Sequence, residues 1–322
     1  MASLLSVENL QVQFQTKKGI NTAVDGVSFS VEKGRILGIV GESGCGKSVT
    51  SMSILQLLGS NARISGGSIK LDGKELIGLP EKEMCRIRGN DIAMIFQDPM
   101  TALNPTLTIG TQLMEPIMLH QNCGKKEAWT RAVDVLKRVG IAAPEKRMKE
   151  YPHQLSGGMR QRVMIAMAVS CEPRLLIADE PTTALDVTIQ AQILELMCEL
   201  REKMGTAIML ITHDMGVVAE TADDVLVLYA GKAVEYGSIE DIFERPKHPY
   251  TQGLLNSIPR LDEDVELLNT IEGTVPAPDA MPAGCRFAPR CPYGKDRCMK
   301  EKPGVYHAGN SLVSCVRYEG EK

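Results

Sequence analysis

The sequence contains no long apolar run. A membrane-spanning helix needs about 18–20 consecutive apolar residues, and residues 163–169, one of the longest apolar stretches, fall far short of that. Residues 1–10 contain one acid and no base, and their apolar run is too short for the core of a secretory signal peptide. We therefore expect a cytosolic chain, in which free thiols or metal ligation are favoured over structural disulfides.

The sequence also lacks an excess of basic charge. Its 36 Lys and Arg residues are balanced by 40 Asp and Glu residues, which gives a net charge of -4. Because both signs are mixed along the chain, no overall basic field exists that would hold nucleic acid or anionic lipid. No internal repeat or low-complexity segment is visible. With 322 residues, 43% of them apolar, the chain is long enough for about two domains.

Hydrophobic periodicity predicts an α/β fold. Residues 10–14 and 27–31 alternate apolar and polar side chains on either side of a short polar turn, which predicts antiparallel strands. The nearly continuous apolar runs 36–40, 174–178 and 207–211 are instead typical of strands buried in a parallel sheet.

A helical insert interrupts this parallel sheet. Helical spacing over 109–120 and 125–139, and again after Gly157, predicts a mostly helical stretch covering about residues 98–173. The sheet then resumes, and residues 224–237 predict a closing hairpin with Ala230 and Gly231 at its turn.

Residues 41–48, G-E-S-G-C-G-K-S, fit the phosphate-loop pattern G-x-x-x-x-G-K-[ST]. The glycines let backbone N–H groups wrap a polyphosphate at the N-terminus of a helix, whose dipole favours anions. Lys47 is expected to reach the β and γ phosphates, and Ser48 to ligate Mg²⁺. The alternative is a plain glycine turn, and Cys45 is expected to be a small filler inside the loop. The expected ATP-binding residues here are Gly41, Ser43, Gly44, Cys45, Gly46, Lys47, Ser48 and Val49.

Two acids follow the buried run 175–178. Asp179 is expected at the carboxyl end of the strand, where Mg²⁺ would be held, and Glu180 lies one residue further out. Glu180 can orient or deprotonate an attacking water molecule. Acidic turn residues after a strand also occur as plain structure, so the interpretation depends on the phosphate loop.

Residues 155–162, L-S-G-G-M-R-Q-R, provide a second helix N-terminus that can bind an anion. Such a site makes sense if it closes on a nucleotide held by another subunit. At this point the sequence resembles the ATP-binding cassette (ABC) family over about residues 4–240, and the resemblance implies a P-loop NTPase fold with a RecA-like mixed sheet. It also implies that Ser156, Gly157, Gly158 and Gln161 form a signature motif that contacts ATP in trans.

The resemblance gives roles to further residues. Gln97 looks like the Q-loop glutamine, Ala184-Leu185-Asp186 matches the D-loop, and His213 matches the switch histidine at the γ-phosphate. Gln97 would then join Ser48 and Asp179 at Mg²⁺, and Glu180, His213 and Gln97 would form the catalytic set. Phe14 is similar to the aromatic that stacks on adenine. The alternatives are a structural role for His213, a helix cap at Gln97 and a core position for Phe14.

The family resemblance implies a two-state machine. Two cassettes would pair head to tail, so that the phosphate loop of one faces the signature motif of the other across ATP. Hydrolysis through Glu180 would remove the bridging γ-phosphate and reopen the pair. Because this chain has a single cassette, its second half must lie in another chain.

The sequence beyond about residue 240 turns Pro-rich, with little periodicity, and predicts a boundary there. Residues 245–255 and 284–292 resemble the C-terminal extension of ATPases from dipeptide, oligopeptide and nickel importers. The expected domains are therefore an ABC domain over 1–240 and an extension over 241–322. A soluble ABC ATPase acting on nucleic acid or ribosomes is the alternative, weakened by the absence of a basic patch and of sustained heptads.

The importer resemblance implies particular partners. These are a related ABC ATPase subunit in a heterodimer, two transmembrane permease subunits and an extracytoplasmic peptide-binding protein, with no nucleic acid. The chain would lie peripherally on the cytoplasmic face of the cell membrane. Nickel, opine or sugar import remains an alternative cargo, since nothing in the sequence identifies the solute.

Four of the nine cysteines gather near the end: Cys285, Cys291, Cys298 and Cys315, with five, six and sixteen residues between them. Four thiolates in a segment with little core of its own fit a metal or cluster site. The spacing is wider than in zinc knuckles, so we favour a [4Fe-4S] cluster, as the resemblance also suggests. Tetrathiolate Zn²⁺ and unligated thiols are the alternatives. The other helical cysteines, Cys85, Cys123, Cys171 and Cys198, are expected to be packing residues.

Overall fold

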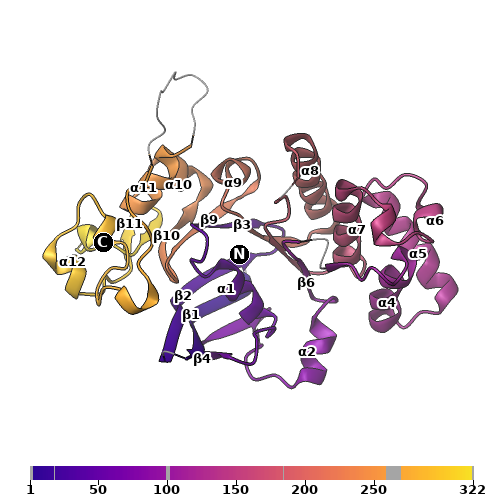
Figure 1. Cartoon of the computed structure of the whole chain (residues 1–322), viewed down its shortest axis with the longest axis horizontal. Coiled ribbons are helices and arrows are strands. Elements are labelled where there is room, and N and C mark those ends of the chain that lie inside the picture. The colour runs from indigo at the N-terminus through magenta and orange to yellow at the C-terminus, as the bar shows by residue number, and fades with distance from the viewer. Residues whose placement is uncertain (1–2, 18, 99–101, 184, 259–269, 321–322) are drawn as a thin grey trace.

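Two β-sheets organise the computed structural model, which describes residues 3–17, 19–98, 102–183, 185–258 and 270–320 (Figure 1). Among these residues, one sheet has the order β2-β1-β4-β5 and the other has the order β11-β12-β10-β9-β3-β8-β7-β6. The strands are β1 (Ser3–Thr16), β2 (Gly19–Glu32), β3 (Ile36–Val40), β4 (Ala62–Leu71), β5 (Lys74–Glu75), β6 (Ile92–Ile95), β7 (Leu175–Asp179), β8 (Ala207–Ile211), β9 (Asp224–Tyr229), β10 (Lys232–Ser238), β11 (Tyr306–Ala308) and β12 (Ser311–Val313).

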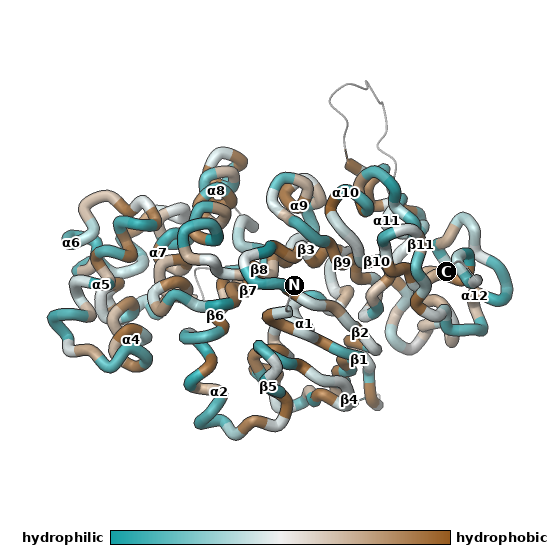
Figure 2. The backbone as a smooth tube through the Cα atoms, turned by 180° about the vertical axis from the view of Figure 1, so that it is seen from behind, coloured by the Kyte–Doolittle hydropathy of each residue, from teal (hydrophilic) through white to brown (hydrophobic). Residues whose placement is uncertain are grey.

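The helices cover the larger sheet and extend from it at one end. They are α1 (Lys47–Ile54), α2 (Glu81–Ile87), α4 (Ile109–Gln121), α5 (Lys125–Arg138), α6 (Pro144–Arg147), α7 (Gly157–Val169), α8 (Val187–Met204), α9 (Met215–Thr221), α10 (Ile239–Glu244), α11 (Pro249–Asn256) and α12 (Asp296–Lys300). Figures 1 and 2 place α4–α7 at one end of the molecule and the C-terminal region at the other, with both sheets between them. None of the described helices is both long and apolar enough to cross a membrane.

The central strands β3, β7 and β8 of the larger sheet are buried on both faces, which explains why they are almost entirely apolar. In β3, Leu37 and Ile39 face the core shared with the smaller antiparallel sheet. Ile36 and Val40 face the opposite core, which is covered by helices of the insert and by α8 and α9. The central part of the sheet is therefore a covered layer, and loops project from the carboxyl ends of its parallel strands.

The fold expected from the sequence is confirmed. β1 and β2 pair antiparallel, and β3, β6, β7 and β8 are parallel, with β9 beside β3. The hairpin β9–β10 turns at Ala230 and Gly231, which have φ of 46° and 81°. The expectation that Cys85 packs inside was wrong, because the side chain is exposed on α2, while Cys123, Cys171 and Cys198 do pack in or against the core.

The C-terminal region joins the larger sheet. β12 pairs antiparallel with β10, through Glu235 with Val313 and Tyr236 with Leu312, and β11 pairs with β12. The hairpin β11–β12 thus forms one edge of the sheet that also contains the central parallel strands.

Candidate functional site

The carboxyl ends of the parallel strands bring the sequence-predicted residues together. The phosphate loop follows β3, Gln97 follows β6, Asp179 ends β7, and His213 follows β8. Because β6, β7, β8 and β3 are neighbours in register, these segments meet at one edge of the sheet. Ligands of open α/β sheets bind at this edge.

The phosphate loop is held in a conformation that only glycine permits at two positions. Gly41 has a φ of 150° and Gly46 a φ of 101°. A Cβ on Gly41 would collide with the carbonyl oxygen of Leu228, and one on Gly46 would lie 3.0 Å from the carbonyl oxygen of Ala23. The loop therefore presses its backbone against two neighbouring strands, and Gly46 leads directly into the N-terminus of α1.

Lys47 and Ser48, which are predicted to bind phosphate and metal, lie at the start of α1, and the predicted metal ligand Asp179 lies at the end of β7. The buried Lys47 ammonium donates to the carbonyl oxygens of Gly41 at 2.7 Å and Glu42 at 3.2 Å. Burial raises the pKa of the Asp179 carboxyl above its usual range, and the neighbouring Ser48 hydroxyl opposes part of that shift. Oδ1 of Asp179 is buried and has no hydrogen-bond partner in the described part of the chain.

Glu180 is the point on which the predicted catalytic residues converge. Its Oε2 accepts hydrogen bonds from Gln97 Nε2 at 2.9 Å and from the Thr183 hydroxyl at 3.0 Å. Its Oε1 lies 3.3 Å from Nδ1 of His213. The structure thus brings Gln97, Glu180 and His213 together, from three strands. Thr183 was missed by the sequence reasoning, although it lies only three residues beyond Glu180.

The backbone of Glu180 is strained. Its φ is 48°, in the left-handed region that non-glycine residues avoid at a cost of about 1–2 kcal/mol. The conformation is held by the Glu180 N–H, which donates to the Ile211 carbonyl at 2.8 Å, so the end of β7 stays tied to β8. This turn directs the carboxylate toward Gln97 and His213 rather than along the strand.

The signature residues lie apart from the phosphate loop. Ser156 caps α7, with its hydroxyl accepting from the Met159 N–H at 3.3 Å. Ser156, Gly157, Gly158 and Asp186 line one groove of about 530 Å³, and Lys47 is not among its lining residues. Asp186 also caps α8 through the Ile189 N–H at 3.0 Å. Ala184 lies outside the described residues.

Two predicted residues occupy less exposed positions. Gln161 is buried, and its amide donates to the Pro181 carbonyl, so it ties α7 to the turn after Glu180. Phe14 is half-buried on β1 and packs against the core of the antiparallel sheet. The ATP contacts predicted for both residues stay predictions.

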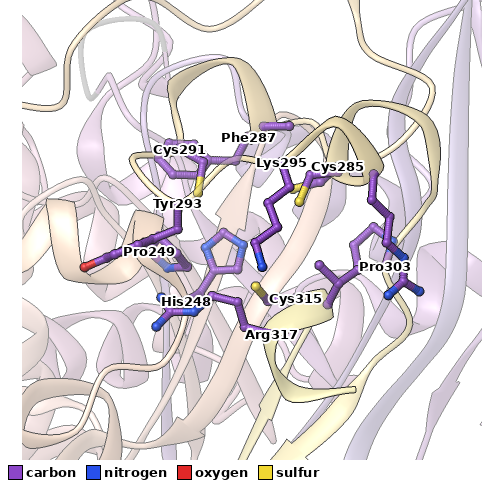
Figure 3. Close-up of a pocket in the computed structure, with 14 residues that line it drawn as sticks. His248, Pro249, Cys285, Phe287, Cys291, Tyr293, Lys295, Pro303, Cys315 and Arg317 are labelled. Atoms are coloured by element: carbon purple, nitrogen blue, oxygen red, sulfur yellow. The ribbon is translucent and has the colours of Figure 1, made fainter. Parts of the chain in front are cut away.

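The four C-terminal cysteines line one cavity of about 160 Å³. Figure 3 shows the sulfur atoms of Cys285, Cys291 and Cys315 around it, with the His248 ring and the Lys295 side chain among them. Burial raises the pKa of the Cys285 thiol to about 11, so a thiolate there requires compensating positive charge. Within the described ranges no three His, Cys, Asp or Glu side chains are grouped closely enough to hold a metal ion. The predicted metal site is therefore not shown.

His248 received no role from the sequence but has a structural one. Its side chain is buried in the wall of the cysteine cavity, and Nδ1 accepts from the Tyr250 N–H at 3.1 Å, which caps α11. The backbone N–H of His248 donates to the buried Glu235 carboxylate at 2.8 Å. His248 thereby fixes the cavity wall to β10.

Known families match most of the chain. Residues 24–183 match the ABC transporter family, and residues 234–298 match the C-terminal region of oligopeptide and dipeptide transporters. The chain is similar to the oligopeptide transport ATP-binding protein AppD of Bacillus subtilis strain 168, with 56% identity over 100% of this chain and 98% of AppD. It is also similar to the oligopeptide transport ATP-binding protein OppD of Escherichia coli K12, with 53% identity over 98% of this chain and 93% of OppD.

Two solved ABC cassettes each match 73% of the chain. The dimeric bacterial ABC transporter cassette MJ0796 is 28% identical and superposes with a TM-score of 0.65 over 73% of this chain and 98% of that chain. A post-hydrolysis dimer of the same cassette, bound to ADP and Pi, superposes with a TM-score of 0.66 at 27% identity, with the same coverage.

Proposed function

The chain belongs to the family of oligopeptide and dipeptide ABC transporter ATP-binding proteins, and on this premise we propose how its residues power peptide import. It is an ABC ATPase of a peptide importer, so its reaction is the hydrolysis of ATP coupled to transport. The observation that carries the residue assignment is the convergence of Gln97, Thr183 and His213 on the carboxylate of Glu180.

Glu180 is the general base of hydrolysis in this proposal. Two of its hydrogen-bond partners are fixed to neighbouring strands, so the carboxylate is oriented before ATP arrives. Gln97 contacts Oε2 of the carboxylate and His213 contacts Oε1. The carboxylate oriented in this way can accept a proton from a positioned water molecule. His213 is exposed over 62% of its side chain, as expected of a residue that meets the γ-phosphate.

Lys47 and the loop N–H groups bind the phosphates in this proposal, and Phe14 stacks on adenine. Ser48, Gln97 and Asp179 would hold Mg²⁺. Oδ1 of Asp179 is buried and has no hydrogen-bond partner among the described residues, so it fits a cation, which would offset the cost of burying an ionised carboxylate. Mg²⁺ would neutralise phosphate charge there.

The second half of the ATP site comes from another chain in this proposal. Ser156, Gly157 and Gly158, with Gln161 behind them and Asp186 beside them, line a groove separate from Lys47 and therefore face a partner cassette. The partner is a related ABC ATPase subunit in a heterodimer. Two permeases and an extracytoplasmic peptide-binding protein complete the importer. The helical insert over 98–173 would receive a coupling helix from a permease. We place the chain at the cytoplasmic face of the membrane.

The division of the chain follows the same logic. We propose an ABC domain over residues 1–240 and a C-terminal extension over 241–322. The match of residues 234–298 to the transporter C-terminal region supports this boundary.

The four C-terminal cysteines are proposed to hold a [4Fe-4S] cluster with a structural or regulatory role, with Zn²⁺ as the alternative. All four line one cavity, and Lys295, Arg297 and Arg317 line it too and would offset thiolate and sulfide charge. We expect brown protein with stoichiometric iron and sulfide after anaerobic purification. Cys291→Ser should lose the iron, whereas Cys85→Ser, which alters an exposed thiol on α2, should retain it. A colourless wild-type chain with stoichiometric zinc would establish Zn²⁺ instead.

The transport function is tested in the assembled complex. The chain should copurify with two permeases, and its ATP hydrolysis should rise when the peptide-binding protein delivers a peptide. Hydrolysis stimulated by nucleic acid or ribosomes, with no permease retained, would replace the importer by the soluble alternative. Lys47→Ala should remove nucleotide binding and uptake together, because its ammonium lies at the loop that receives the phosphates.

A further inference from the structure

Glu42, the second residue of the phosphate loop, is held by side chains from the C-terminal region. Its backbone N–H donates to the hydroxyl of Tyr250 at 2.9 Å. Its carboxylate accepts from Nη1 of Arg290 at 2.9 Å and 3.1 Å. These partners lie 208 and 248 residues further along the chain. The phosphate loop is therefore in direct contact with residues far from it in sequence.

The two side chains that hold Glu42 are themselves fixed. Arg290 is only 6% exposed, and its Nε and Nη2 donate to the carbonyl oxygens of Glu272 at 2.9 Å and Ile271 at 3.1 Å. A guanidinium bonded on several edges presents its remaining N–H groups in one geometry. Tyr250 is fully buried, and its ring packs against the Tyr229 ring in an edge-to-face arrangement with the ring centroids 4.7 Å apart.

The charge of Glu42 makes this arrangement relevant to ATP. A carboxylate at the second position of a loop that receives a triphosphate adds a negative charge where anions must bind. Arg290 neutralises it at short range and with little solvent, where Coulomb interactions are strong. The Tyr250 hydroxyl at the same time fixes the peptide unit next to Gly41, whose carbonyl accepts from Lys47.

We propose that Arg290 and Tyr250 are positioning residues for the phosphate loop, so that the C-terminal region sets the conformation and charge of the loop before ATP binds. The proposal rests on the proposed function, because it takes residues 41–48 as the ATP-binding loop. Neither side chain is assigned to touch ATP. Both act through Glu42.

The test compares two arginines of the C-terminal region in the full-length chain. Arg290→Ala frees Glu42, whereas Arg286→Ala breaks a contact to Asp25 (3.0 Å) that also ties this region to the cassette but does not involve Glu42. The dissociation constant of a fluorescent ATP analogue with Mg²⁺ is measured for each. We expect Arg290→Ala to weaken binding about tenfold, within the ~5–150-fold range of typical coupling between sites. Arg286→Ala should stay within about twofold of wild type.

Further variants separate positioning from misfolding. Tyr250→Phe keeps the buried ring and should weaken binding about threefold, and Arg290→Lys should recover part of the loss because a cation is restored. In the Glu42→Gln background, Arg290→Ala should lose most of its effect, since the charge it neutralises is gone. In the assembled complex, Arg290→Ala should raise the KM for ATP with kcat within about twofold.

Three results would overturn the proposal: equal weakening by Arg290→Ala and Arg286→Ala, no change in Arg290→Ala, or full additivity with Glu42→Gln. Lys47→Ala, measured beside them, distinguishes the two levels of inference. If Lys47→Ala loses the nucleotide while Arg290→Ala keeps wild-type affinity, only this inference fails. If Lys47→Ala still binds with wild-type affinity, the assignment of the ATP loop fails and this inference falls with it.

Discussion

The phosphate-loop edge of the sheet and the C-terminal cysteine cavity both gather reactive side chains, but by different means. At the sheet edge, fully buried strands end side by side, and hydrogen bonds of 2.9–3.3 Å lock Glu180 between Gln97 and His213. Around the cavity, the cysteines come from turns, short helical elements and the end of a small hairpin. Their sulfurs share a space without forming a metal-binding group within the described residues.

The difference shows which interactions position the side chains in each of the two regions. At the sheet edge, buried strands position the side chains, and hydrogen bonds link Glu180 to residues that follow the neighbouring strands. The C-terminal region has few buried apolar residues and is held by ion pairs such as Arg290 with Glu42 and Arg286 with Asp25. A bound metal or cluster would add to the stability of that region, as ligation does in other small metal-binding segments.

The largest expected effect is on the chemistry at the preorganised site. Glu180→Gln should leave ATP binding intact and lower turnover in the assembled complex by about a thousandfold, since general-base catalysis contributes ~10²–10⁴. Glu172→Gln, which alters an exposed glutamate paired with Arg138, is the matched control. Undiminished turnover in Glu180→Gln would show that Glu180 is not the general base.

A second prediction addresses the loop that this edge supports. Gly41→Ala should destabilise the chain by about 3 kcal/mol, because the new Cβ meets the Leu228 carbonyl and the φ of 150° disfavours a side chain. Chemical denaturation measures the loss. Gly309→Ala, at a φ of 66° with nothing within 4 Å of the new Cβ, should cost only about 1 kcal/mol. Equal destabilisation by Gly41→Ala and Gly309→Ala would show that the close approach of the Leu228 carbonyl to Gly41 does not matter for stability.

A third prediction compares packing in the two regions directly. Val227 in β9 and Val313 in β12 are both fully buried, so replacing each by alanine removes the same atoms. Val227→Ala should lower the free energy of unfolding by about 2 kcal/mol and Val313→Ala by about 1 kcal/mol. A hairpin at the edge of the sheet can relax into the space left by the missing methyl groups, whereas a central strand cannot. Thermal unfolding of both variants measures the difference. The reverse order would show that the C-terminal hairpin is the more rigid element.

The smallest expected effect concerns the buried carboxyl beside Ser48. Burial raises the pKa of Asp179, so the fold favours the ionised carboxylate less than the unfolded chain does. Asp179→Asn should therefore stabilise the nucleotide-free chain by about 1 kcal/mol while it removes the Mg²⁺ dependence of ATP binding. Asp134→Asn, at an exposed site on α5, should change neither property. If Asp179→Asn destabilises the chain, then contacts within the fold offset the cost of burying the Asp179 carboxylate.

Local patterns predicted the parts of the structure that local physics determines. The loop over 41–48, the helices near 109–121 and 125–138, and the turn at Ala230 and Gly231 were all expected close to their observed places. Strand β4, which alternates imperfectly through adjacent glycines, and the short β5 and β6 were not predicted. Their pairing depends on partners distant in sequence.

The contacts between distant segments had no signal in the sequence. Nothing near Glu42 or Arg290 indicates that the two side chains meet, because each looks like an ordinary surface charge. The same holds for the pairing of β12 with β10, which involves only two registered residue pairs. For the cysteines, the spacing predicted a common site, and the structure supplies the common cavity but not the ligand geometry.

The pairing of β12 with β10 also bears on solubility. Without residues beyond Ser238, the outward side of β10 would present unpaired backbone N–H and C=O groups, and strands of other molecules can add to such an edge. The short hairpin β11–β12 covers β10 and leaves only a three-residue strand at the border. A cassette truncated after the ABC portion would thus be prone to edge-to-edge self-association. The hairpin β11–β12 therefore protects the chain against aggregation.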